Sequence, residues 1–170
     1  MPTLYLFIGY PGAGKTTIAK HIEHMTGAVH LWADQERQRL FGYATHSEQE
    51  NHRLYEYLDN KTDELLSQGK SVIFDTNFNF HKDRLKLREI AERHAAKTVI
   101  IWVNTSKEVA KPRALHHTHR DRNGYSVTMT EEEFKRLSDH LEPPTEDEKA
   151  IVIDGSKLEE IDLNKALNLY

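Results

Sequence analysis

The sequence predicts an α/β fold in which a parallel sheet of about five strands carries helices on both faces. Short apolar runs alternate with helical segments along the whole chain, which is the order that βαβ units produce. The first apolar run, residues 3–8, leads directly into GYPGAGKTT at residues 9–17. A length of 170 residues suits one domain with its own core. We therefore expect a single domain over residues 1–170.

The composition excludes several classes of protein. Hydrophobic residues make up 38% of the chain and charged residues 29%, as in an ordinary soluble domain. A net charge of −4 argues against coating nucleic acid through bulk positive charge. Without cysteine there is no disulfide, thiolate zinc site or thiol catalysis. No stretch approaches the ~20 apolar residues of a membrane span. The first strand begins too early for a signal peptide, so we expect a cytoplasmic protein with no membrane partner.

Residues 9–17 match G-x-x-x-x-G-K-[ST], the phosphate-binding loop, between a strand and a helix as that motif requires. Glycines let successive backbone N–H groups turn toward an anion, and the following helix directs its positive end there. Lys15 then supplies a cation for the β- and γ-phosphates, and the Thr16 hydroxyl a Mg²⁺ ligand. The residues expected to bind ATP in this loop are Gly12, Ala13, Gly14, Lys15, Thr16 and Thr17.

The remaining elements follow from apolar spacing and capping residues. Further strands are expected at 28–32, 71–75, 98–103 and 150–154. Helices are expected at 15–25, 35–40, 47–67, 81–94, 106–116, 130–140 and 158–167. Gly27 is a C-cap for the first helix, and Pro112 predicts an interruption or kink in the fifth. Capping boxes are expected at Ser47–Glu50 and Thr130–Glu133.

Polar residues follow three of the strands, and parallel strands end at one edge of a sheet, where ligands bind. Asp34 is placed to accept the proton of an attacking hydroxyl, and Arg37 to hold an anionic group of the acceptor. The alternative is an Asp34 that caps the helix at 35–40 beside a solvated Arg37. Asp75 is expected to bind Mg²⁺ near Thr16, with a turn residue as the alternative. Asn77 positions the substrate or makes an Asx turn.

Residues 113–140 are expected to form a helical and loop lid over this edge. Arg120 is the expected catalytic arginine, Arg122 a nucleotide-binding one and Arg113 a third candidate, because a guanidinium stabilises the charge of phosphoryl transfer. The alternative is a solvated basic loop. The histidines at 116, 117 and 119 match no zinc template. By analogy, residues 141–144 and 153–156 are expected to shape the adenine pocket.

The phosphate loop, Asp34-x-x-Arg37, Asp75-Thr76-Asn77 and the Arg-rich lid, in this order, resemble the small P-loop kinases of the "AAA domain, predicted kinase" type. These include the polynucleotide 5′-hydroxyl kinase domain and, more distantly, zeta toxins and chloramphenicol phosphotransferase. The resemblance covers about residues 3–155. It implies phosphate and Mg²⁺ ligands at Lys15 and Thr16, a general base at Asp34 and a role for Asp75. It also implies an acceptor-phosphate arginine at Arg37 and a lid arginine at Arg120.

The sequence therefore predicts an ATP- and Mg²⁺-dependent phosphotransferase acting on a hydroxyl acceptor, with a polynucleotide 5′-OH as the first choice of acceptor. A nucleoside, sugar or antibiotic is the alternative acceptor. A nucleotide-binding ATPase or switch without an acceptor is the alternative from another class, against which Asp34 argues. A nucleic-acid-binding module is disfavoured by the acidic charge and the lack of an aromatic stacking platform.

Overall fold

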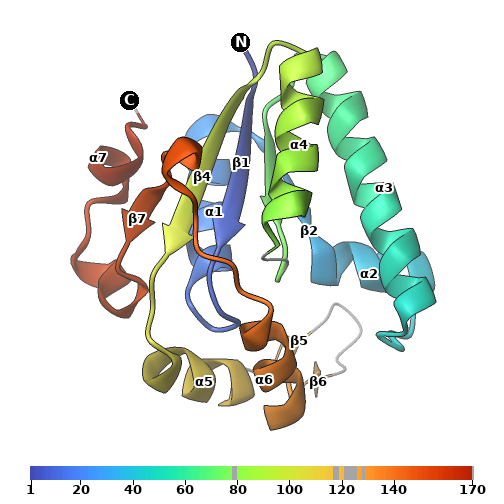
Figure 1. Ribbon diagram of the computed structural model, residues 1–170, viewed down its shortest axis with the longest axis vertical. Helices are drawn as coiled ribbons and strands as arrows, with labels where there is room; N and C mark the ends of the chain where they lie inside the picture. The colour runs from blue at the N-terminus through green and yellow to red at the C-terminus, as the bar shows by residue number, and fades with distance from the viewer. Residues whose placement is uncertain (78–79, 117–118, 121–125, 128, 170) are drawn as a thin grey trace.

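The computed structural model describes residues 1–77, 80–116, 119–120, 126–127 and 129–169, with only the backbone at 119–120 and 126–127. Its main sheet has five parallel strands in the order β2-β3-β1-β4-β7. The strands are β1 (Thr3–Ile8), β2 (Val29–Trp32), β3 (Val72–Asp75), β4 (Lys97–Val103) and β7 (Ile151–Ile153). Figure 1 shows these strands flanked by helices. The predicted fold class is confirmed, and β3 is buried along its whole length as expected for a central strand.

The helices follow the predicted order. They are α1 (Lys15–Thr26), α2 (Ala33–Phe41), α3 (Glu48–Ser67), α4 (His81–Arg93), α5 (Lys107–His116), α6 (Glu131–Asp139) and α7 (Leu163–Leu167). Two 3₁₀ segments occur at Glu146–Glu148 and Gly155–Glu160. Two short strands, β5 (His119–Arg120) and β6 (Ser126–Val127), pair antiparallel between α5 and α6.

Alternating side chains of the sheet build two apolar layers. Leu4, Leu6 and Ile8 of β1 pack in the layer that contains the buried leucines of α3 and Leu87 of α4. Tyr5 and Phe7 pack in the other layer, with the apolar residues of α1 and Leu167 of α7. Burying one large aliphatic side chain contributes roughly 1.5–3 kcal/mol. The two layers hold the strands so that their carboxyl ends share one edge.

The structure differs from three local predictions. Helix α2 begins at Ala33, so Asp34 lies in its first turn and Trp32 is the N-cap. Helix α5 continues through Pro112 without an interruption, because the ring removes only one hydrogen bond from this short helix, and a kink there stays a prediction. The helix predicted at 158–167 is divided, because Ile161 is extended and the Asp162 side chain caps a new helix through Lys165 N.

Of the two predicted capping boxes, one is complete and the other is only half formed. Thr130 and Glu133 form the predicted reciprocal pair at the start of α6. Ser47 accepts a hydrogen bond from Glu50 N, 3.2 Å away, so half of the predicted motif is present. The Glu50 carboxylate accepts instead from Thr45 and from Arg37. Bonds from the preceding turn and from the more distant Arg37 therefore replace the reciprocal capping bond to Ser47 N.

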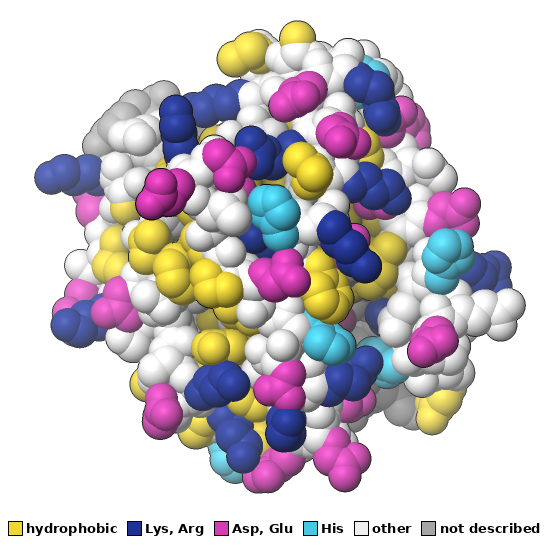
Figure 2. Space-filling model, in the orientation of Figure 1, with side chains coloured by type: hydrophobic (Ala, Val, Ile, Leu, Met, Phe, Trp, Pro, Cys, Tyr) yellow, Lys and Arg dark blue, Asp and Glu magenta, His cyan; other side chains and the backbone are white. Residues whose placement is uncertain are grey.

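The surface carries both signs of charge. On the face shown in Figure 2, Lys and Arg side chains are interspersed with Asp and Glu rather than gathered into one basic patch. Within the part of the chain that the structure describes, no helix combines the length and apolarity needed to cross a membrane.

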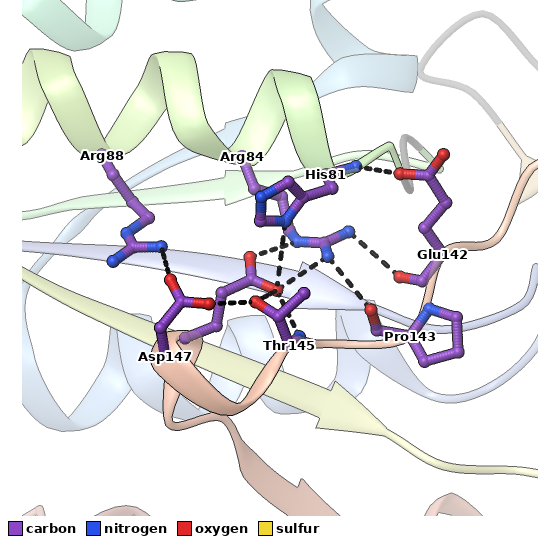
Figure 3. A network of polar contacts seen from close by, with 8 residues as sticks. His81, Arg84, Arg88, Glu142, Pro143, Thr145 and Asp147 are labelled. Atoms are coloured by element: carbon purple, nitrogen blue, oxygen red, sulfur yellow. Dashed lines mark hydrogen bonds and ion pairs between the residues drawn. The ribbon is translucent and has the colours of Figure 1, made fainter.

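The connection between α6 and β7 is fastened to α4 (Figure 3). Arg84 donates to the carbonyls of Glu142 and Pro143, at 3.1 and 3.4 Å. The Glu142 carboxylate accepts a hydrogen bond of 2.6 Å from the backbone N–H of His81, at the start of α4. The predicted lid at 113–140 therefore has an anchored carboxyl end, close to the segment that follows Asp75.

Candidate active site

Two glycines of the loop between β1 and α1 have backbone conformations that disfavour any other residue, and one of them is also closely packed. Gly12 and Gly14 have φ values of 78° and 110°, a region that L side chains rarely adopt. A Cβ on Gly12 would lie 2.3 Å from the carbonyl oxygen of Ala110 and 2.8 Å from the backbone nitrogen of Ala114. The loop therefore rests directly on the backbone of α5.

Lys15 is folded back onto its own loop. Its side chain is buried, and Nζ donates to the carbonyl oxygens of Gly9 at 2.9 Å and Tyr10 at 2.8 Å. Burial lowers the pKa of Lys15 to about 8, although the charges of Asp75 and Asp34 oppose that shift. The ammonium is thus held in the loop by carbonyls that a bound phosphate can replace.

The segments that follow β4 and β7 also contact the loop between β1 and α1. Thr105 Oγ1 donates to the carbonyl of Ala13 at 2.9 Å, and Arg113 Nη1 to the carbonyl of Gly155 at 2.8 Å. A Cβ on Gly155 would meet Thr105 Oγ1 at 2.0 Å, so glycine is required at this contact. A cavity of about 420 Å³ beside these strand ends is lined by Asn104, Ser106, Val109, Val152, Asp154 and Ser156.

Asp75 and Asp34 come to the same edge from neighbouring strands. Asp75 ends β3 and is paired in register with Trp32, the last residue of β2. Asp34 follows two residues later, exposed in the first turn of α2. Both carboxylates act on the charge of Lys15. The structure therefore places Asp34 and Asp75 where their charges reach Lys15, and the roles of the three residues stay predictions.

His30 is a residue of this site that the sequence analysis missed. Its Nε2 lies 3.0 Å from Asp75 Oδ2, and its Nδ1 lies 3.3 Å from Glu23 Oε2. The sequence does mark His30, because it is the only polar residue in the apolar run 28–32. Its pairing partner across the strands could not be read without the register of β2 against β3.

A protein-family model described as "AAA domain" matches residues 4–144. The chain belongs to this AAA-domain family. The family prediction is thereby confirmed, while the particular resemblance to polynucleotide kinase stays a prediction. No curated protein matches the sequence.

Several solved structures similar to this AAA domain are named as kinases, and at these low identities they show the fold alone. A proposed kinase from Chloroflexus aurantiacus J-10-fl has a TM-score of 0.77 at 18% identity, with 98% of this chain and 95% of that chain covered. A sugar kinase from Janibacter sp. HTCC2649 has a TM-score of 0.71 at 20% identity, with 99% of this chain and 94% of that chain covered. The Mycobacterium tuberculosis APS kinase, solved with AMPPNP and APS, has a TM-score of 0.70 at 14% identity, covering 99% and 96%.

Arg37 of this AAA domain is bound to two side chains of α3. It is buried, its Nη1 forms an ion pair with Glu50, and its Nη2 donates to Asn51 Oδ1 at 2.7 Å. These contacts join α2 to α3. Burial opposes ionisation of Glu50, but hydrogen bonds from Thr45, Arg37 and His46 outweigh it and lower the pKa of Glu50 to about 2. The acceptor-binding role of Arg37 stays a prediction.

The other predicted residues lie at the same edge or in the lid. Thr16 and Thr17 lie in the first turn of α1, where Thr16 is half-buried and Thr17 is exposed. Asn77 is half-buried in a bend after β3. Arg120 is described only as backbone in β5, and Arg122 lies outside the described residues. Considering the described side chains, no group of three or more His, Asp or Glu could hold a metal.

Proposed function

We propose that this AAA domain is an ATP-dependent kinase that transfers the γ-phosphate to a hydroxyl group of a small molecule. The observation that carries the proposal is the convergence of Lys15 with the carboxylates of Asp34 and Asp75 at the carboxyl edge of the sheet. A cation beside a glycine loop suits a triphosphate, and a second carboxylate beside it suits an attacking alcohol.

The loop binds the triphosphate through its backbone N–H groups and the start of α1. Lys15 Nζ leaves the carbonyls of Gly9 and Tyr10 and turns to the β- and γ-phosphate oxygens. Thr16 and Asp75 offer hydroxyl and carboxylate oxygens, the hard donors that fit Mg²⁺. The metal supplies neutralisation of phosphate charge when it is bound.

Asp34 acts as the general base. The acceptor oxygen attacks the γ-phosphorus, the bond between that phosphorus and the bridging oxygen of ADP breaks, and Asp34 accepts the hydroxyl proton. Its exposure at the start of α2 leaves room for an acceptor. Arg120 and Arg122 of the lid contribute charge to the transferring phosphoryl group, with Arg113 near the nucleotide through its contact with Gly155.

A small acceptor is preferred to a polynucleotide 5′-OH for two reasons. Arg37, which would hold a nucleic-acid phosphate, is buried, paired with Glu50 and bonded to Asn51, so a phosphate would compete with a carboxylate for its charge. Two similar structures are named as a sugar kinase and a gluconokinase, the latter from Sinorhizobium meliloti with a TM-score of 0.65 at 17% identity.

Transfer of label from γ-³²P-ATP tests the proposal. A panel of sugars, sugar acids, nucleosides and aminoglycosides is compared with a 5′-OH oligonucleotide. We expect label on a small molecule, a loss of about 10²–10⁴ in kcat for Asp34→Asn, and unchanged ATP affinity. Asp63→Asn, a half-buried carboxylate on α3 that pairs with Arg93, is the control.

Two results contradict the proposal. Label on the oligonucleotide alone would restore the polynucleotide acceptor. ATP hydrolysis that no acceptor stimulates and Asp34→Asn leaves unchanged would indicate an ATPase or switch.

A further inference from the structure

His30 links two carboxylates from different elements. Glu23 lies on α1, His30 on β2 and Asp75 at the end of β3, and the imidazole contacts one carboxylate with each ring nitrogen. The side chains of His30 and Asp75 are 8% and 3% exposed, whereas that of Glu23 is 50% exposed. The contact with Asp75 is thus the one shielded from water, where a hydrogen bond is strongest.

The sheet fixes the geometry of this contact. His30 is paired in register with Ile73 and Trp32 with Asp75, so His30 and Asp75 are diagonal neighbours on one face of adjacent strands. The rings of His30 and Trp32 are stacked, with centroids 6.3 Å apart and planes inclined by 20°. The imidazole is therefore held in place by packing before any ligand binds.

We propose that His30 is a positioning residue that orients the Asp75 carboxylate for the magnesium ion of the bound nucleotide. An ionised carboxylate only accepts hydrogen bonds, so Nε2 donates to Asp75 Oδ2 and restrains rotation of the carboxylate. The other oxygen, Oδ1, would then be the one that Asp75 offers to the metal. Glu23 holds the far side of the ring. The inference rests on the nucleotide and magnesium part of the proposed function and is independent of the acceptor.

The reason that Asp75 needs such a partner is its attraction to Lys15. The two charges interact across the buried site. A carboxylate free to rotate would pair with the ammonium and remove Lys15 from the phosphates. By holding Oδ2, His30 restrains the carboxylate and so keeps the cation and the metal ligand separate. Partners that orient metal ligands in this way typically change metal affinity by about 10–100-fold.

The test measures the affinity of a fluorescent ATP analogue with and without Mg²⁺, using the full chain. His30→Leu removes the donor, and His30→Gln restores an N–H close to the position of Nε2. His24→Leu, an exposed histidine on α1, is the matched control for the same chemical change. Binding of Mn²⁺ to the nucleotide complex, followed by electron paramagnetic resonance, reports on the metal directly.

We expect His30→Leu to raise the Mg²⁺ concentration for half-maximal binding by about 10-fold, with Mg²⁺-free affinity within about twofold of the parent protein. His30→Gln should recover most of the loss. In an Asp75→Asn background, His30→Leu should have no further effect, because its partner is gone.

Three results would overturn the inference. They are an unchanged Mg²⁺ dependence in His30→Leu, an equal loss of Mg²⁺-free affinity, or an additive effect with Asp75→Asn. Since no acceptor is present, a failure here is distinct from a failure to find phosphotransfer.

Discussion

Arg84 and Glu148 form a buried, two-point ion pair between α4 and the segment that precedes β7. Arg84 Nε lies 2.7 Å from Glu148 Oε1, and Nη2 lies 2.8 Å from Oε2. Both side chains are almost fully inaccessible to water. A two-point arginine–carboxylate geometry is the strongest form of such a pair. It fixes the chain on the carboxyl side of the predicted lid to α4 (Figure 3).

We predict that breaking this pair destabilises the fold strongly. Glu148→Gln or Arg84→Met leaves one buried charge unpaired, and the expected loss is about 3–5 kcal/mol in the free energy of unfolding, measured with urea. The double variant Arg84→Met/Glu148→Met should lose less than either single variant, since no charge remains buried. Lys135→Ala, which breaks an exposed pair with Asp139, is the control and should cost far less than either buried variant. Equal losses for buried and exposed pairs would contradict the prediction.

Two buried glutamates predict that stability falls in acid. Burial disfavours ionisation of Glu148, but hydrogen bonds from Arg84 and Thr145 outweigh it and lower its pKa to about 2. Hydrogen bonds likewise outweigh burial at Glu50 and lower its pKa to about 2. Because both pKa values are depressed in the folded state, the stabilisation is complete above the ordinary pKa of 4.5 and is lost as the pH falls toward 2. Urea unfolding between pH 6 and pH 2.5 should show this loss, with a smaller slope in Glu50→Gln. An unchanged slope in that variant would exclude Glu50 as a source.

Nucleotide affinity should fall above pH 8. Burial lowers the pKa of Lys15 to about 8 in the free protein, whereas a bound triphosphate favours the ammonium form. Binding above pH 8 then requires uptake of a proton, and affinity decreases by up to about tenfold per pH unit until the pKa of the complex is reached. Titration of a fluorescent ATP analogue from pH 7 to pH 9.5 measures the effect. Lys15→Met should bind weakly at every pH and lose the dependence, and a flat profile in the parent protein would refute the assignment to Lys15.

Replacing Gly12 should cost more than replacing a glycine of similar backbone conformation in open space. Gly12→Ala introduces a positive-φ penalty of about 1–2 kcal/mol and a clash with the carbonyl of Ala110 that adds about 1–3 kcal/mol. Gly27→Ala, with a φ of 69° and nothing within 4 Å of the new Cβ, carries only the first cost. Thermal unfolding without nucleotide compares them. Equal decreases in melting temperature for the two variants would show that α5 moves away from the new Cβ without cost and would contradict the prediction.

Much of the site could be predicted because it follows strands. The phosphate loop requires no partner to be recognised, and Asp34 and Asp75 each follow an apolar run that ends at the same edge. His30 and Glu148 were not recognised as partners, because their roles depend on residues 45 and 64 positions away in the chain. Arg37 was assigned to an acceptor from its spacing to Asp34, yet it is bonded to Glu50 and Asn51 of α3.

The sequence alone determined the α/β class, the nucleotide loop and the edge of the sheet at which the chemistry gathers. These depend on local periodicity and on the conformational freedom of glycine, which act over a few residues. Only the tertiary structure decided that His30 faces Asp75, that Arg37 pairs with Glu50, and that Arg84 binds the segment between α6 and β7. A buried charge takes whichever partner the packing of distant elements brings within hydrogen-bond distance, and that distance is not encoded in spacing along the chain.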